Sequence, residues 1–401
     1  MADAKILTYK DGEFKSIIGQ EVQGSIIDTD SKIYKGKEWY SPIAYPRAYV
    51  SPTSNLEFTQ LGNKSWTYIV DASSEGGTDI KKLYGIDSIG NLYKIDVSYN
   101  STETRVDITE AKISDKRWRY IRRHYYNFNY WWFAIDADGY LYGWGDNDYG
   151  QLGLGDTTSR YEPTKVGDKK WKSVTGYGFA IYAIDSDGYL YAWGVGNLGI
   201  PGTSSTSSPV RVCDILWASI YPGLWSLAID IDGYLYAWGE NEEGQLGLGD
   251  KTKRYEPTKV GDKKWRIVVP QYSPSCSYAL DIDGYFYVAG TGSDTTGAPG
   301  VNNTQFYKVT DNIYKTIKNR YIIDHSGHYY RRSTYDYSNL QLLNDKRWKA
   351  LENYYAIDTE GWLYHLNSDY EYTKVDERIW DTFLFSLSNG TIRNPFVIVE
   401  K

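Results

Sequence analysis

The stretch GYLYGWGDNDYGQLGLGDTTSRYEPTKVGDKKWKSV, residues 139–174, decides the fold because it returns as GYLYAWGENEEGQLGLGDKTKRYEPTKVGDKKWRIV at residues 233–268. The two copies are identical at 28 of 36 positions. A third, shorter copy, AIDSDGYLYAWGVGNLGIPG, lies between them at residues 183–202, so the offset of 94 residues (233 − 139) halves to a period of about 47. Repetition at this period predicts a propeller or solenoid, in which each copy is one structural unit.

Each unit contains a turn glycine between two strand-like segments that alternate apolar and polar residues. Asp-Gly supplies the positive φ that a tight hairpin needs, and a large aromatic residue precedes each turn. The turn glycines are Gly90, Gly139, Gly188, Gly233, Gly284, Gly327, Gly361 and Gly390. The aromatic residues are Trp66, Trp118, Trp171, Trp217, Trp265, Tyr314, Trp348 and Trp380. We expect eight hairpins, each with an aromatic ring that packs one sheet against the next.

The motif YLYxWGxNxxGQLGLGD, followed by proline and KVGDKKW, resembles the repeat of the regulator of chromosome condensation family, in a divergent form similar to bacterial and viral versions. This resemblance implies an all-β fold: a single β-propeller of four-stranded blades, closed by joining the N- and C-terminal strands. The family pattern favours seven blades, and literal counting of hairpins leaves eight open. No residue of the family's exchange activity can be placed on this sequence.

The first 60 residues have a different cadence from the repeats. They contain AKILTYKDGEFKSIIG at residues 4–19, which resembles the opening of phage tail and neck proteins, and KIYKGKEWY at residues 32–40. We therefore predict two regions: residues 1–60, an N-terminal β segment that contributes a closing strand and serves as an attachment element, and residues 61–401, the propeller.

Composition and charge restrict the partners. The net charge is −7 and the pI about 5.3, and a sequence-independent grip on nucleic acid needs a basic surface, so the sequence argues against a nucleic-acid partner. No apolar run is long enough to span a membrane or to act as a signal peptide. The expected location is a virus particle, or otherwise the cytoplasm. The 41 tyrosines, 15 tryptophans and 10 phenylalanines instead suit strands and binding surfaces.

The sequence offers little support for chemistry. Gly150, Gly153 and Gly155 lack the Lys-Ser/Thr of a phosphate loop and are interpreted as structural. The paired aspartates of the DxDG turns lack the closing glutamate of a calcium loop, and His325 with His328 gives only two metal ligands. We therefore predict no catalytic residue, no metal and no cofactor.

The segment RWRYIRRHYYNFNYWWF at residues 117–133 is the longest of the connections that follow each aromatic marker. Equivalent connections of a propeller emerge at one end, and Tyr, Trp and Arg concentrate in protein interfaces. Core packing is the competing explanation for any single ring. The candidate binding residues are Arg119, Arg122, Arg123, Tyr125, Tyr126, Phe128, Tyr130, Trp131, Tyr177, Tyr221, Trp225 and Tyr272.

These observations favour a non-enzymatic structural and recognition propeller of a virus particle, a phage tail or tail fibre. It would bind another virion protein, a host-surface protein or a host glycan through one aromatic-rich face. Two alternatives stay open: an intracellular regulator of the nucleotide-exchange or chromatin-adaptor type, and a carbohydrate-active enzyme.

Overall fold

Strands joined by turns build the computed structural model of this chain. The residues it describes are 4–6, 8–10, 13–15, 26–27, 63–64, 66–71, 80–100, 105–272, 275–290, 303–318, 321–332, 340–342, 346–352, 355–360, 362–366, 372–374, 380–384 and 397–400. Every regular element within these ranges is a β-strand, which confirms the all-β class. The same ranges hold no helix with the length and apolarity that a membrane crossing requires.

The chain divides into two compact units. Unit 1 comprises residues 1–123, 134–137 and 347–401, and unit 2 comprises residues 124–133 and 138–346. The predicted boundary near residue 60 lies outside the described residues and stays a prediction.

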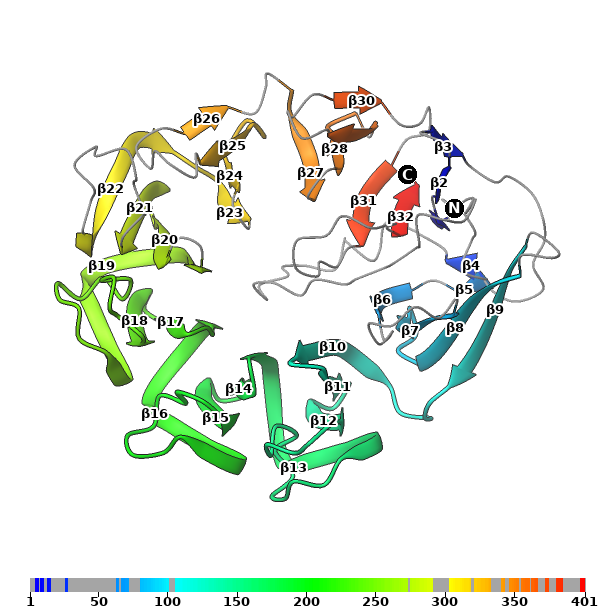
Figure 1. Ribbon diagram of the computed structural model, residues 1–401, viewed down its shortest axis with the longest axis horizontal. Helices are drawn as coiled ribbons and strands as arrows, with labels where there is room; N and C mark the ends of the chain where they lie inside the picture. Colours follow the sequence, from blue (N-terminus) through cyan, green and yellow to red (C-terminus); the bar gives the residue numbers. More distant parts are fainter. Residues whose placement is uncertain are drawn as a thin grey trace. The chain divides into compact units, whose positions relative to one another are not determined.

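Thirteen strands follow one another in chain order as one hydrogen-bonded series (Figure 1). They are β10 (Trp118–Tyr126), β11 (Asn129–Asp136), β12 (Tyr140–Gly145), β13 (Arg160–Tyr177), β14 (Ala180–Asp185), β15 (Tyr189–Val195), β16 (Ser205–Tyr221), β17 (Trp225–Asp230), β18 (Tyr234–Gly239), β19 (Arg254–Tyr272), β20 (Ser275–Asp281), β21 (Tyr285–Gly290) and β22 (Asn303–Ile313).

Three long strands of this series each serve two sheets. In β13, residues 160–170 pair with β12, whereas residues 171–177 pair with β14. The strands β16 and β19 are divided in the same way. The series therefore consists of four antiparallel sheets of four strands, with three strands shared, and 4 × 4 − 3 gives the 13 strands.

Three further four-stranded sheets are separate. Unit 2 holds β23 (Thr316–Lys318), β24 (Tyr321–Ile323), β25 (Tyr329–Arg332) and β26 (Leu340–Leu342). Unit 1 holds one sheet of β6 (Trp66–Asp71), β7 (Ile80–Asp87), β8 (Leu92–Asn100) and β9 (Arg105–Lys112), and one of β27 (Trp348–Glu352), β28 (Tyr355–Asp358), β29 (Leu363–Leu366) and β30 (Tyr372–Lys374).

The two chain ends meet in one three-stranded sheet of unit 1. In it β32 (Val397–Glu400) lies between β31 (Trp380–Leu384) and β1 (Ala4–Ile6), with Lys5 opposite Ile398. An N-terminal and a C-terminal strand thus share a sheet, as the sequence predicts. The small pairs β2 (Thr8–Lys10) with β3 (Glu13–Lys15), and β4 (Ile26–Ile27) with β5 (Asn63–Lys64), complete the described strands.

The core lies between successive sheets of unit 2. One cluster joins Trp217 to Tyr182 and Leu190 of the preceding sheet, and a second joins Trp265 to Trp225 and Leu235. For Trp217 and Trp265, this confirms that the aromatic residue before the turn packs one sheet against the next. The sequence predicts that buried and exposed residues alternate along the strands on either side of each turn. This prediction is wrong for β14 and β17, in which all six residues are buried. An inner strand covered on both faces has no polar side to keep.

Candidate interaction site

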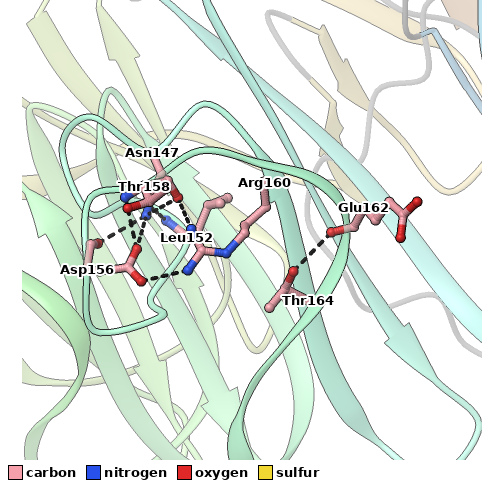
Figure 2. A network of polar contacts seen from close by, with 7 residues as sticks. All are labelled: Asn147, Leu152, Asp156, Thr158, Arg160, Glu162 and Thr164. Atoms are coloured by element: carbon pink, nitrogen blue, oxygen red, sulfur yellow. Dashed lines mark hydrogen bonds and ion pairs between the residues drawn. The ribbon is translucent and has the colours of Figure 1, made fainter.

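The glycine-rich loop after β12 is held by one buried asparagine. The Asn147 Nδ2 group donates hydrogen bonds to the carbonyl oxygens of Asp156 (3.0 Å) and Thr158 (3.1 Å), and Asn147 Oδ1 accepts one from the Leu152 N–H at 2.8 Å (Figure 2). Arg160 closes the loop through an ion pair with the Asp156 carboxylate at 2.6 Å. Hydrogen bonds from the Thr158 N–H and from Arg160 lower the pKa of Asp156.

The second copy repeats this network. Asn241 donates to the carbonyl oxygens of Asp250 (3.0 Å) and Thr252 (3.1 Å), and Arg254 pairs with Asp250 at 2.6 Å. A network that recurs in two repeats with the same distances belongs to the architecture of the repeat rather than to one chemical site.

The loop glycines allow close packing on the next sheet. A Cβ on Gly153 (φ +75°) would lie 2.8 Å from Trp193 Nε1, and one on Gly150 would lie 2.8 Å from the Ser207 Cα. Gly155 has φ +88° and donates its N–H to the Ser207 carbonyl oxygen at 2.8 Å. The structural interpretation of these three glycines is therefore confirmed.

The aspartate turns are closed by hydrogen bonds from the backbone. The buried Asp185 carboxylate accepts hydrogen bonds from the N–H groups of Asp187 (3.0 Å) and Tyr189 (2.9 Å), and Asp230 and Asp281 repeat the pattern. His328 pairs with Asp324 at 3.0 Å in the turn that also holds His325. Over the described ranges, no three His, Cys, Asp or Glu side chains lie close enough together to hold a metal ion.

The hairpin between β10 and β11 differs from its counterparts. Its two turn residues, Asn127 (φ 49°) and Phe128 (φ 64°), both have left-handed backbones, and no other non-glycine residue of the described ranges has a positive φ. Two such residues in a two-residue loop form a type I′ turn, where asparagine is favoured and phenylalanine is strained. Phe128 nevertheless exposes 77% of its surface.

The corresponding hairpin of the next sheet is shorter, although its loop also has two residues. Tyr177 pairs directly with Ala180, so Gly178 and Phe179 form the loop, and Gly178 takes the positive φ of 58°. Tyr130 corresponds to Phe179, since their carbonyl oxygens accept the N–H groups of Asp146 and Val195 respectively. The additional residues predicted in the 117–133 connection therefore extend the β10–β11 hairpin outward.

Aromatic rings bring this hairpin and the neighbouring loops together. Phe179 stacks on Tyr149 with ring centroids 3.9 Å apart and meets Tyr126 edge-on at 5.1 Å. Tyr126 and Tyr149 expose 45% and 41% of their surfaces. We call Tyr126, Phe128, Tyr149 and Phe179 the aromatic surface of unit 2.

The structure separates the candidate binding residues into three groups. Tyr126 and Phe128 are exposed, and Tyr125, Tyr130 and Tyr177 are half-buried, with Tyr125 stacked on Tyr130 at 4.7 Å. Burial raises the pKa of Tyr177. Arg119 is exposed on the part of β10 that belongs to unit 1, where Arg122 and Arg123 are half-buried and the Arg122 Nη1 and Arg123 Nε atoms are covered.

Three candidates are corrected. Trp131, Tyr221 and Trp225 are buried, so they pack the core and cannot meet a partner directly. Trp131 stacks on His124, and the Trp225 indole N–H donates to Ser277 Oγ at 2.9 Å. The Tyr272 side chain lies outside the described residues.

Sequence reasoning missed two members of the aromatic surface as binding candidates. Tyr149 lies inside the repeated loop, at the position that holds Glu243 in the second copy, and Phe179 corresponds to Tyr130. The exchange of tyrosine for glutamate between otherwise similar loops was the available signal.

Comparison with known proteins identifies the repeats. The model of the regulator of chromosome condensation (RCC1) repeat matches residues 138–176 and 232–269. These ranges contain the two long copies at residues 139–174 and 233–268. Among proteins with curated descriptions, none matches this chain.

Several solved structures are similar in part. Yeast RCC1 (Prp20) bound to Kap60 is 16% identical, with 69% of this chain and 67% of that chain covered and a TM-score of 0.44. Prp20p from Saccharomyces cerevisiae, described with its binding properties to Gsp1p and histones, is 15% identical, with 80% of each chain covered and a TM-score of 0.45. Human WBSCR16 is 21% identical over 56% of this chain and 61% of its own, with a TM-score of 0.39. The match spans about three fifths of WBSCR16, and at these TM-scores no function follows from the similarity.

Proposed function

The chain carries repeats of the RCC1 family, and from this premise we propose that it is a non-enzymatic β-propeller that binds a partner protein through the aromatic surface of unit 2. The exposed Phe128 on a strained turn is the observation that carries this proposal. Left-handed backbone in a bulky residue costs about 1–3 kcal/mol and persists at sites where the strained geometry serves a purpose. Here it places an apolar ring in solvent.

The remaining composition of the surface fits the same purpose. Tyrosine and phenylalanine give large contact areas with few rotatable bonds, and interface energy concentrates in such rings. Leu224, exposed by 52%, occupies the position in the following sheet that Phe179 holds in its own, because its carbonyl oxygen accepts the Glu240 N–H.

Blade number and closure form part of the proposal. Among the described residues there are seven four-stranded sheets and one three-stranded sheet with both chain ends. This number supports eight blades rather than the seven that the family pattern favours, with the terminal sheet as the closing blade.

Site-specific photocrosslinking tests the binding face. A photoreactive phenylalanine at position 128 should give a covalent adduct with one protein from the native source, whereas the same residue at Tyr161, which is 94% exposed, should not. Absence of any adduct at position 128, or the same adduct at both positions, would contradict the proposal.

We also propose placement in a virus particle, supported by the likeness of residues 4–19 to phage tail and neck proteins. Mass spectrometry of purified particles tests this placement. The chain should be recovered at constant stoichiometry with the major structural proteins, and its recovery only from the cell fraction would contradict the placement.

A further inference from the structure

We propose that the aromatic surface of unit 2 binds a guanidinium group, so that the partner presents an arginine-containing segment. This inference rests on the proposed protein-binding function and names the chemistry of its partner. Its basis is a difference between two nearly identical loops.

In the second copy two of the loop carboxylates are paired with lysines. Lys253 pairs with Glu240 at 2.5 Å, and Lys251 lies 3.9 Å from Glu243. The hydrogen bond to Glu240 is the largest influence that raises the pKa of Lys253. Two carboxylates of this loop, Glu240 and Glu243, are therefore paired with lysines of the same loop.

In the first copy both lysines are replaced and one carboxylate becomes an aromatic ring. Thr157 and Ser159 stand where the second copy has Lys251 and Lys253, and Tyr149 stands in place of Glu243. Asp146 and Asp148 keep the acidic positions of Glu240 and Glu242. Within the described ranges no ion pair joins Asp148 to another residue, and its side chain is exposed.

These carboxylates border the aromatic surface. Asp148 immediately precedes Tyr149, and Asp146, which is half-buried, accepts the Tyr130 N–H on Oδ2 at 2.6 Å. Tyr149 is held in place, since its N–H donates to Gln151 Oε1 at 2.9 Å and one face of its ring lies on Phe179. The exposed part of the ring is therefore held in the loop that also carries Asp146 and Asp148.

Aromatic rings next to unmatched carboxylates favour a planar cation. A guanidinium group stacks on an aromatic face while it donates two parallel hydrogen bonds to a carboxylate, and it gives up hydration more readily than an ammonium group. A neutral glycan could stack on the same rings, but it would gain nothing from the loss of both lysines. The charge difference between the copies thus favours arginine.

Isothermal titration with a ten-residue (Arg-Gly)5 peptide tests the inference on the full chain. The peptide should bind, (Lys-Gly)5 should bind at least 5-fold more weakly, and the citrulline version should not bind. The double variant Thr157→Lys/Ser159→Lys installs the lysines of the second copy and should weaken binding at least 10-fold.

The matched control adds the same charge elsewhere. Ser186→Lys/Ile231→Lys places two lysines in exposed DxDG turns at the other end of the sheets and should change the affinity less than 2-fold. Tyr149→Glu introduces the residue of the second copy and adds a negative charge, yet it should weaken binding because the ring is lost. Stronger binding by Tyr149→Glu would show simple charge attraction and would overturn the inference.

The outcomes separate this inference from the proposed function. If (Arg-Gly)5 fails to bind, or binds both double variants equally, while the crosslink at position 128 still forms, the guanidinium site is wrong and protein binding stands. If neutral oligosaccharides bind in place of the peptide and no protein crosslinks, both are wrong.

Discussion

Two separate features can require glycine at a position of the repeats: a positive φ, and a neighbouring atom too close for a Cβ. Gly153 and Gly167 both have positive φ, at 75° and 59°, but only Gly153 faces a neighbour, Trp193, whereas a Cβ on Gly167 would meet nothing within 4 Å. Gly153→Val should lower the free energy of unfolding by about 2–4 kcal/mol through strain and clash together. Gly167→Ala should cost only about 1 kcal/mol. Urea denaturation measures both, and equal losses would contradict the packing role of Gly153.

Burial of Tyr182 makes stability depend on alkaline pH. Burial raises the pKa of Tyr182 to about 12, and its hydroxyl donates a hydrogen bond to the Asn197 carbonyl oxygen. The folded state keeps the phenol neutral above pH 10, where the unfolded chain ionises. Its contribution to stability is therefore complete below pH 10 and is lost as the pH rises toward 12.

Tyr182→Phe removes this dependence. Between pH 9 and 11 the wild type should lose about 1 kcal/mol more stability than the variant, from the proton taken up on folding. The exposed Tyr161→Phe serves as the control and should behave as wild type. Chemical denaturation at each pH provides the measurement, and identical pH slopes for Tyr182→Phe and wild type would refute the assignment.

At the residue level, the sequence predicted the structural roles of residues that recur at the same position in successive repeats. Gly150, Gly153 and the turn aspartates recur at fixed positions, so their structural role follows from the sequence alone. For Tyr149, the exchange with Glu243 marks the position as different between the copies. It does not show that the ring stacks on Phe179, because that contact is made with a residue of the neighbouring sheet.

At the scale of the elements, the turn of the β10–β11 hairpin lowers the stability of the protein, because Phe128 has a left-handed backbone. Phe128→Gly should raise the free energy of unfolding by roughly 0.5–1 kcal/mol, because glycine adopts the left-handed backbone without strain. Little packing is lost, since the ring is mostly in solvent. Thermal and urea denaturation provide the readout.

Tyr126→Gly is the control in the same hairpin. Tyr126 lies in β10 without positive φ and contacts Phe179, so its replacement should destabilise the protein. Destabilisation by Phe128→Gly of the same size as by Tyr126→Gly would show that the turn is not strained.

The length of the 117–133 connection predicted that this element differs from its equivalents, and the hairpin confirms an extension. The sequence did not reveal which rings face outward. Trp131 and Tyr130 are neighbours in a strand, and their burial depends on the loops that cover one face, which only the assembled sheets determine.

On the scale of the whole molecule, residues almost 400 positions apart depend on one another. Val399 of the central strand β32 is paired with both Ala4 and Thr382. Val399→Pro removes a backbone donor from a strand paired on both sides. Amide hydrogen exchange of residues 4–6 should then accelerate at least 10-fold, while exchange in β13 stays unchanged. Unaltered exchange in residues 4–6 would contradict the joining of the chain ends.

The repeats predicted the hairpin turns of the described residues, and the resemblance to the regulator of chromosome condensation family implied the four-stranded sheets and the pairing of the two chain ends. Neither predicted that three long strands would each be shared by two sheets. The change of partner occurs at Trp171, Trp217 and Trp265. In β13 and β19 it follows a register shift that contains Gly167 and Gly261, both with positive φ. A glycine followed by aspartate indicates a turn between two strands, so the sequence does not reveal that one strand continues through it.

The most direct test of the central claim is the dissociation constant of Phe128→Gly for the protein that crosslinks at position 128. Loss of an aromatic anchor worth about 2 kcal/mol should raise this constant roughly 30-fold, in a variant at least as stable as the wild type. An unchanged dissociation constant would show that the strained, exposed Phe128 does not serve binding, and would contradict the assignment of the aromatic surface as the interaction site.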